Sequence, residues 1–166
     1  DWAGNTGNTE YNEFFFDNVN ATSTVTYPVD TKSYSSLTQV NGLANDDASG
    51  LHPANVDYVE IRISSGTQYW DQTNHIWGAE VWNVATGTDT WSLTVDGDAW
   101  NSDVTYTINC RAYDKVTQPS GSNVEVNFTT YTFTFDAVAP TSKVTAPQNS
   151  YYYSDFATIS GTTWDK

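Results

Sequence analysis

Acidic side chains stand at three separate places where an ordered segment of the chain gives way to a loop. Asp17 follows an aromatic run, the pair Asp46 and Asp47 follows an apolar segment, and Asp114 ends another. Carboxylate oxygens are ligands that Ca²⁺ prefers, and the ion takes six to eight oxygens at about 2.3–2.6 Å. These aspartates predict a Ca²⁺ site if the fold brings the three segments together. The alternative interpretation is that they are solvated residues of turns and strand ends.

Aromatic side chains are a second candidate for function, because the chain holds 7 Trp and 11 Tyr. Large amphipathic rings exposed on a β-sheet protein, with Asp and Asn nearby, can stack on sugar rings. The alternative is that most of them pack in a core or between repeats. The candidates for a glycan-binding platform are Tyr69, Trp70, Trp77, Trp82 and Trp100.

Residues of the kind that catalyse reactions form no recognisable pattern. His52 and His75 lie in predicted loops without a second histidine or a cysteine at metal-ligand spacing, and no nucleophile motif such as GxSxG is present. The lone Cys110 falls on an inward-facing position and is interpreted as a small core residue. Asp96-Gly97-Asp98 is interpreted as a turn, because a Ca²⁺ loop would also need a bidentate Glu. The sequence predicts a protein that is not an enzyme.

The charge of the chain limits its partners. Six Lys and Arg stand against 20 Asp and Glu, which gives a formal net charge of −14. This balance repels nucleic-acid phosphates and anionic lipid, and it favours divalent cations. No run of about 18 apolar residues predicts a membrane span. We expect neither nucleic-acid binding nor membrane insertion.

The elements that must position these residues are organised around an internal repeat. Residues 14–47 recur as residues 133–166 without a gap, at an offset of 119 residues. The matched positions include Phe, Asp, Pro and Gly, which makes a chance match in a Thr-rich chain a poor explanation. The chain therefore contains one repeat of domain size and parts of its neighbours.

Short β-branched and aromatic runs separated by Gly, Asn, Asp and Pro predict an all-β chain. In residues 56–63 the inward positions are Val59, Ile61 and Ile63, and similar alternation marks residues 90–95 and 106–113. Residues 68–85 are aromatic and less regular, and are assigned to one or two strands. The last strand of the repeat is predicted over residues 123–136. Its apolar positions change parity between Val124, Val126 and Phe128 and the later Tyr131, Phe133 and Phe135, and a bulge near Thr129-Thr130 would restore a single inward face.

Seven or more short strands in about 100 residues are typical of an immunoglobulin-type β-sandwich. We predict one complete sandwich over residues 18–136. Residues 1–17 are then the end of a preceding repeat, and residues 137–166 the first strands of a following one.

In such a sandwich the loops that carry the acidic residues meet at one end. Asp17 in the linker should approach Asp46 and Asp47, and Asp114 should join them. This arrangement predicts a Ca²⁺ site at the joint between repeats. Asp136 and Asp165 would form the equivalent half of the next joint.

Several segments resemble motifs of the bacterial immunoglobulin-like (Big-type) repeats. VNGLANDD and ISGTTWD are similar to the second strand of that family, TYTINCRAYD to its sixth strand, and DWAGN to the loop that follows. FDNVNATSTVTYP and FDAVAPTSKVTAP are similar to the junction between successive repeats.

The resemblance implies a structural tandem repeat of a large extracellular or cell-surface protein, one that forms a stalk, surface layer or filament and can present an adhesive region. The alternative function is a carbohydrate-binding module that uses exposed Trp and Tyr. The expected partners are neighbouring repeats of the same polypeptide, or identical subunits that exchange strands in a fibre, and surface glycans.

Overall fold

The computed structural model describes residues 3, 11, 17–46, 55–116 and 123–165, and within these ranges the chain is all-β, without an α-helix. No helix in this part of the chain has the length and apolar character needed to cross a membrane. The elements are β1 (Thr22–Tyr27), β2 (Lys32–Tyr34), β3 (Gln39–Asn45), β4 (Val56–Ser65), β5 (Gln68–Asp71), β6 (Ile76–Gly78), β7 (Asn83–Val84), β8 (Thr86–Gly87), β9 (Thr90–Thr94), the 3₁₀ turn η1 (Gly97–Ala99), β10 (Val104–Asp114), β11 (Thr130–Phe135), β12 (Thr141–Ala146) and β13 (Ser160–Trp164).

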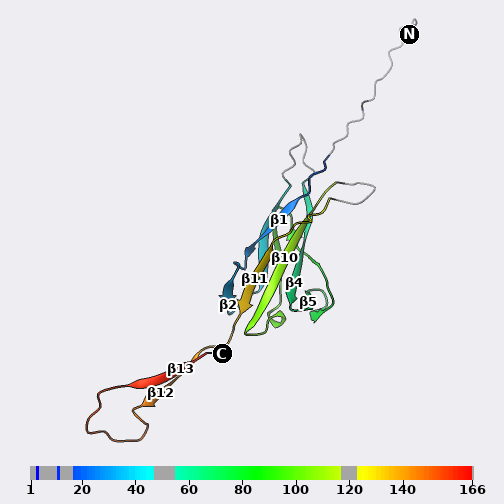
Figure 1. Ribbon diagram of the computed structural model, residues 1–166. Coiled ribbons are helices and arrows are strands. Elements are labelled where there is room, and N and C mark those ends of the chain that lie inside the picture. Colours follow the sequence, from blue (N-terminus) through cyan, green and yellow to red (C-terminus); the bar gives the residue numbers. More distant parts are fainter. Residues whose placement is uncertain (1–2, 4–10, 12–16, 47–54, 117–122, 166) are drawn as a thin grey trace.

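Two sheets enclose one hydrophobic core, as in a β-sandwich (Figure 1). The first sheet has the strand order β1-β3-β9-β8, and the second has the order β2-β11-β10-β4-β5-β6, with β7 paired to β4. The pairings are antiparallel except that β2 runs parallel to β11. The prediction of an all-β chain is confirmed.

Strict alternation along the central strands produces this core. Val59, Ile61 and Ile63 of β4 are fully buried, as their spacing predicts. On β10, the inward positions from Tyr106 to Ala112 are buried in the same way, and the outward ones carry polar or aromatic side chains. The buried residues of both sheets belong to a single cluster.

The segment before β11 differs from the prediction. Residues 123–129 form no regular strand, and only an isolated bridge joins Val124 to Tyr113. Glu125 points inward and Val126 is exposed, which is the reverse of the predicted alternation. The Glu125 carboxylate can be buried because Ser23 Oγ and the Ala112 N–H both donate hydrogen bonds to it, at 2.6 and 3.1 Å.

A separate two-stranded sheet, β12–β13, follows the sandwich (Figure 1). Its pairing repeats that of β1 and β3: Thr22 faces Asn45 in one and Thr141 faces Trp164 in the other, and the registers shift between Val25 and Tyr27 and between Val144 and Ala146. Each of these positions differs from its counterpart by the offset of 119 residues found in the sequence.

Local contacts of the two pairs also correspond. The Val29 N–H donates to the Tyr34 hydroxyl at 2.7 Å, and the Gln148 N–H donates to the Tyr153 hydroxyl at 2.9 Å. Positive φ angles occur at the matched Thr31 and Ser150. The internal repeat is therefore a repeat of structure as well as of sequence.

Candidate functional site

Asp17, Asp46 and Asp114 come together at one end of the sandwich. Asp17 precedes β1, Asp46 follows β3, and Asp114 is the last residue of β10. The start of β1 pairs with the end of β3 in the first sheet, and the end of β10 pairs with the start of β4 in the second. Because β1 packs against β10, the three segments can meet at one end of the sandwich. One carboxylate oxygen from each of the three lies within 4.8 Å of the other two.

All three aspartates are buried, with exposures of 7% for Asp17, 8% for Asp46 and 0% for Asp114. Two of them shape their own loops: Asp17 Oδ1 accepts the Val19 N–H at 2.9 Å, and Asp114 Oδ1 accepts the Val116 N–H at 3.0 Å. The second oxygen of Asp114 is buried and has no hydrogen-bond partner among the described residues. Three ionised carboxylates in a small buried volume repel one another and lose hydration, so the charged cluster is energetically unfavourable without a bound cation.

The other predicted acidic residues behave differently. Asp47 lies outside the described residues. Asp136 Oδ1 accepts hydrogen bonds from Ser102 Oγ and from the Val138 N–H, at 2.9 and 3.0 Å. The Val138 contact matches that between Asp17 and Val19. Asp165 is exposed, and neither Asp136 nor Asp165 is part of a group of three possible metal ligands in the described ranges.

A second group, His75, Asp96 and Asp98, was not predicted as a site. His75 Nδ1 lies 2.6 Å from Asp96 Oδ2, and Gln72 Nε2 donates to the same oxygen at 3.0 Å. The group lies at the surface, and Asp96 already has two partners. His75 lies in the turn between β5 and β6, whereas Asp96 follows β9. Only the folded hairpin brings them together, so their spacing in the sequence carries no signal of the contact. His52 lies outside the described residues.

Two of the predicted aromatic platform residues are core residues. Trp70 and Trp100 are buried, and Trp100 donates its indole N–H to the Leu37 carbonyl at 2.7 Å. Trp77 is partly buried, packs on the core and donates to the Ala99 carbonyl at 3.1 Å. The prediction that Trp70 and Trp100 offer a face to sugars is therefore wrong, because their rings fill the sandwich.

The remaining two, Tyr69 and Trp82, lie over arginines on the outer face of the second sheet. The Arg62 guanidinium lies 5.7 Å from the Tyr69 ring and 4.8 Å from the Trp82 ring, and that of Arg111 lies 4.0 Å from Trp82. Arg111 is also paired with Glu60 at 2.7 Å. These cation–π contacts hold Trp82 against the protein.

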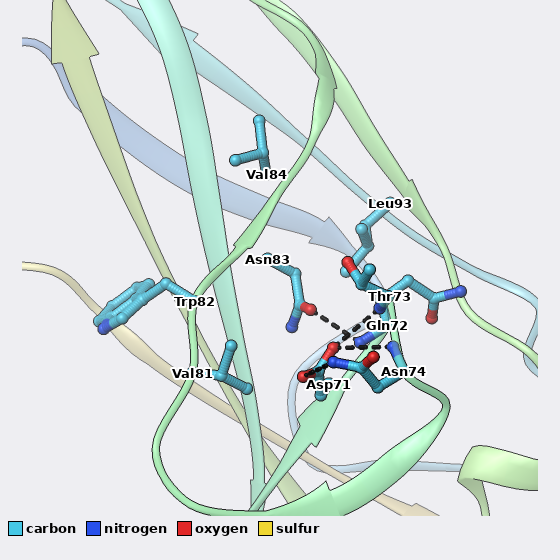
Figure 2. A pocket seen from close by; sticks show the side chains of 9 residues that line it. All are labelled: Asp71, Gln72, Thr73, Asn74, Val81, Trp82, Asn83, Val84 and Leu93. Carbon is cyan, nitrogen blue, oxygen red and sulfur yellow. Dashed lines mark hydrogen bonds between the residues drawn. The ribbon is translucent and has the colours of Figure 1, made fainter.

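A hollow of about 410 Å³ lies beside the β5–β6 turn (Figure 2). Trp82 lines its rim, but Figure 2 shows its side chain directed away from Asp71 and Asn74. Asn83 lines the hollow, and both ends of its side-chain amide already have hydrogen-bond partners. Its oxygen accepts the Gln72 N–H at 2.8 Å, and its nitrogen donates to the Trp70 carbonyl at 2.9 Å. The hollow therefore lacks an aromatic floor for a sugar ring.

Comparisons with known proteins do not identify the chain. No protein-family model, curated protein or solved structure matches it. The resemblance to Big-type repeats stays a prediction.

Proposed function

We propose that this chain is a structural module of a tandem array of immunoglobulin-like sandwiches, in a large extracellular or cell-surface protein that forms a stalk, surface layer or filament. The observation that carries the proposal is the repetition of the β1–β3 junction in β12–β13, with the same register and the same turn contacts. A module built to be joined to copies of itself accounts for this repetition. A catalytic role would not require it.

The exposed apolar side chains of the second copy support the proposal. In the sandwich, Val25, Leu37 and Val40 are buried, with exposures of 7%, 2% and 0%. Their counterparts 119 residues later are also large and apolar, but their exposures are 60% for Val144, 40% for Phe156 and 75% for Ile159. Burying such side chains stabilises a fold by roughly 1.5–3 kcal/mol each. This face of β12–β13 is therefore suited to cover the second sheet of a following sandwich.

The linker between the two parts is short and anchored at its start. The Asp136 N–H donates to the Tyr34 carbonyl and the Ala137 N–H donates to Ser102 Oγ, both at 2.9 Å. Pro140, whose φ is fixed, precedes β12. Because β11 ends beside the start of β10, this linker leaves the sandwich at the end opposite Asp114. Modules joined in this way would form a stiff rod.

Carbohydrate binding is the alternative function, and the structure favours it less. Of the five candidate rings, only Tyr69 and Trp82 lie on an outer face outside the core, and both are covered in part by Arg62. A pull-down on insoluble polysaccharides tests it. Binding that disappears in Trp82→Ala, with the thermal melt unchanged, would favour the alternative over the structural role.

The structural proposal is tested with a tandem protein spliced in register, in which residue 166 is followed by residues 48–166. Lys166 corresponds to Asp47, so this chain can complete a second sandwich around β12–β13. In the tandem we expect slow amide exchange at the first Val144 and the first Ile159, which the second sandwich covers. In the single chain we expect fast exchange at both positions. Fast exchange at these positions in both proteins would contradict the proposal.

A cysteine substitution distinguishes the two ways in which a neighbour can complete the sandwich. Ser23 lies against Cys110, and its counterpart in the second copy is Ser142. In the tandem, Ser142→Cys at the first copy of this position should form a disulfide within the chain with the second copy of Cys110. In the single chain, a disulfide between the introduced cysteine of one molecule and Cys110 of another would show that identical subunits exchange strands, whereas a disulfide between two introduced cysteines would not, because position 142 is exposed there. Replacing the second Cys110 of the tandem with Ala is the control, and it should abolish the intrachain product.

A further inference from the structure

We propose that Asp17, Asp46 and Asp114 bind one Ca²⁺ ion at the end of the sandwich where β1 begins. The site lies within a single sandwich, so this inference stands apart from the proposed function. The three carboxylates come from three different segments: the residues before β1, those after β3, and the end of β10. Their oxygens lie within 4.8 Å of one another. Two oxygens bound to the same Ca²⁺ at about 2.4 Å can be at most about 4.8 Å apart, so the spacing fits a shared ion.

The burial of Asp114 gives independent support for a ligand. This side chain is completely buried, and its Oδ2 has no donor among the described residues, where it also forms no ion pair. A buried carboxylate oxygen without a donor or a cation is strongly unfavourable. A divalent cation in the cluster would supply the missing partner and remove the repulsion among the three anions.

Glu125 is a buried carboxylate that is satisfied by hydrogen bonds, unlike Asp114 Oδ2. Its Oε2 accepts hydrogen bonds from Ser23 Oγ and the Ala112 N–H, at 2.6 and 3.1 Å. The fold thus supplies donors to this buried acid from β1 and β10, and Asp114 ends the second of these strands. The contrast between Glu125 and Asp114 points to a ligand at the aspartate cluster.

The donor set selects the kind of ion. Among the described residues the cluster offers carboxylate oxygens and no His or Cys, which is a donor set typical of Ca²⁺ and not of Zn²⁺. Mg²⁺ requires near-ideal octahedral geometry and keeps several waters, whereas Ca²⁺ accepts irregular sets of carboxylates in one- or two-oxygen contacts. Three aspartates on three loops match the looser requirement. The remaining positions would be filled by the second carboxylate oxygens and by water.

Binding would fix the direction in which the chain enters the sandwich. Asp17 belongs to the segment before β1, whereas Asp46 and Asp114 are attached to the ends of β3 and β10. An ion shared by the three would tie that segment to both sheets. The expected result is a higher melting temperature and slower amide exchange at Val19 when the ion is bound.

The test is a calorimetric Ca²⁺ titration of the full chain after treatment with a chelator. We expect one ion per chain with a dissociation constant of about 10⁻⁴–10⁻³ M, at the weak end of protein Ca²⁺ sites because the donor set is small and irregular, and weaker binding of Mg²⁺. Asp114→Asn and Asp46→Asn should each weaken binding by about tenfold or more, since each removes a charged ligand. Asp98→Asn is the matched control, because it changes an acidic residue of the exposed His75 group, and it should leave the affinity unchanged.

A melting experiment guards against variants that fail to fold. In chelator, Asp114→Asn should melt at or above the temperature of the unsubstituted chain, because it removes one of three mutually repelling charges. In millimolar Ca²⁺, the unsubstituted chain and Asp98→Asn should gain clearly more stability than Asp114→Asn and Asp46→Asn, because stabilisation follows the ratio of ion concentration to dissociation constant. The absence of both heat and stabilisation at millimolar Ca²⁺ would overturn the proposal, as would equal weakening by Asp98→Asn.

Discussion

Two titratable side chains on opposite faces of β10 show how burial controls chemistry at the scale of single residues. Burial raises the pKa of the Cys110 thiol to about 11, and the nearby Glu125 charge adds to the effect. Burial also raises the pKa of Tyr113 to about 12, helped by its hydrogen bond to Glu60, in which the hydroxyl donates to Oε2 at 3.0 Å. Both groups are therefore neutral at physiological pH. Cys110 is a core residue and not a reactive thiol, as its inward position predicts.

These shifts predict a loss of stability at alkaline pH. In the unfolded chain the thiol ionises near 9.0 and the phenol near 10.0, while the folded chain keeps both protons. The folded-state pKa values are raised, so their contribution is complete below about pH 9 and is lost as the pH rises through 11 and 12. The free energy of unfolding in urea, measured from pH 8 to pH 12, should fall across this range.

Cys110→Ala provides the check on that prediction. Its decline in stability between pH 9 and pH 11 should be shallower than that of the unsubstituted chain, because one of the groups with a raised pKa is gone. Tyr152→Phe, at a fully exposed tyrosine, is the control and should not change the slope. Identical slopes for Cys110→Ala and the unsubstituted chain would contradict the assignment.

At the scale of elements, the glycine shared by the two copies of the repeat has a physical reason. A Cβ on Gly42 would lie 2.0 Å from the ring of Trp91 and 2.1 Å from the Thr24 carbonyl oxygen. A Cβ on the matched Gly161 would lie 2.6 Å from the Lys143 carbonyl oxygen. In both pairs the strands approach too closely for a side chain, and in the sandwich Trp91 fills the space.

Gly42→Ala should therefore destabilise the sandwich. Overpacking of a tight core costs about 1–3 kcal/mol, and a buried indole has little room to move. Thermal unfolding should show a clear decrease in melting temperature. Gly78→Ala is the matched substitution in a strand, because no atom lies within 4 Å of its added Cβ. Equal melting temperatures for the two variants would show that the close packing at Gly42 is incorrect.

The elements also show which parts of the fold a sequence can predict. Alternation identified the buried faces of β4, β9 and β10, because each of these strands is covered on one side only. It failed before β11, where the buried side chain is Glu125. Its burial depends on donors from two other strands, Ser23 of β1, 102 residues away in the sequence, and Ala112 of β10. The local sequence also contains no pattern that predicts the parallel pairing of β2 with β11.

The candidate site was predictable for a topological reason. Asp46 follows the end of β3, Asp114 ends β10 and Asp17 precedes β1, and the topology of a sandwich places these segments together. The position of each ring was not predictable, because Trp70 fills the core whereas Trp82 lies against an arginine on the outer face, and the local sequence of the irregular 68–85 region does not distinguish the two. Only the pairing of β4 with β10 brings Arg62 and Arg111 to Trp82.

At the scale of the whole molecule, the arrangement of the two ends defines the module. The acidic cluster lies at the end where β1 begins, and β12–β13 follow the opposite end through a short anchored linker. Each sandwich would therefore receive its predecessor at one end and its successor at the other. Extension along a single axis is the consequence, and it suits a stalk or filament.

Small-angle X-ray scattering of the in-register tandem protein tests the proposed modular role most directly. Because β10 has 11 residues at about 3.4 Å each, one more sandwich should lengthen the particle by roughly 37 Å. We predict that the maximum dimension increases by about this amount relative to the single chain, while the cross-sectional radius of gyration stays the same. A compact particle with a larger cross-section, or the profile of one folded unit with an unfolded tail, would contradict the account.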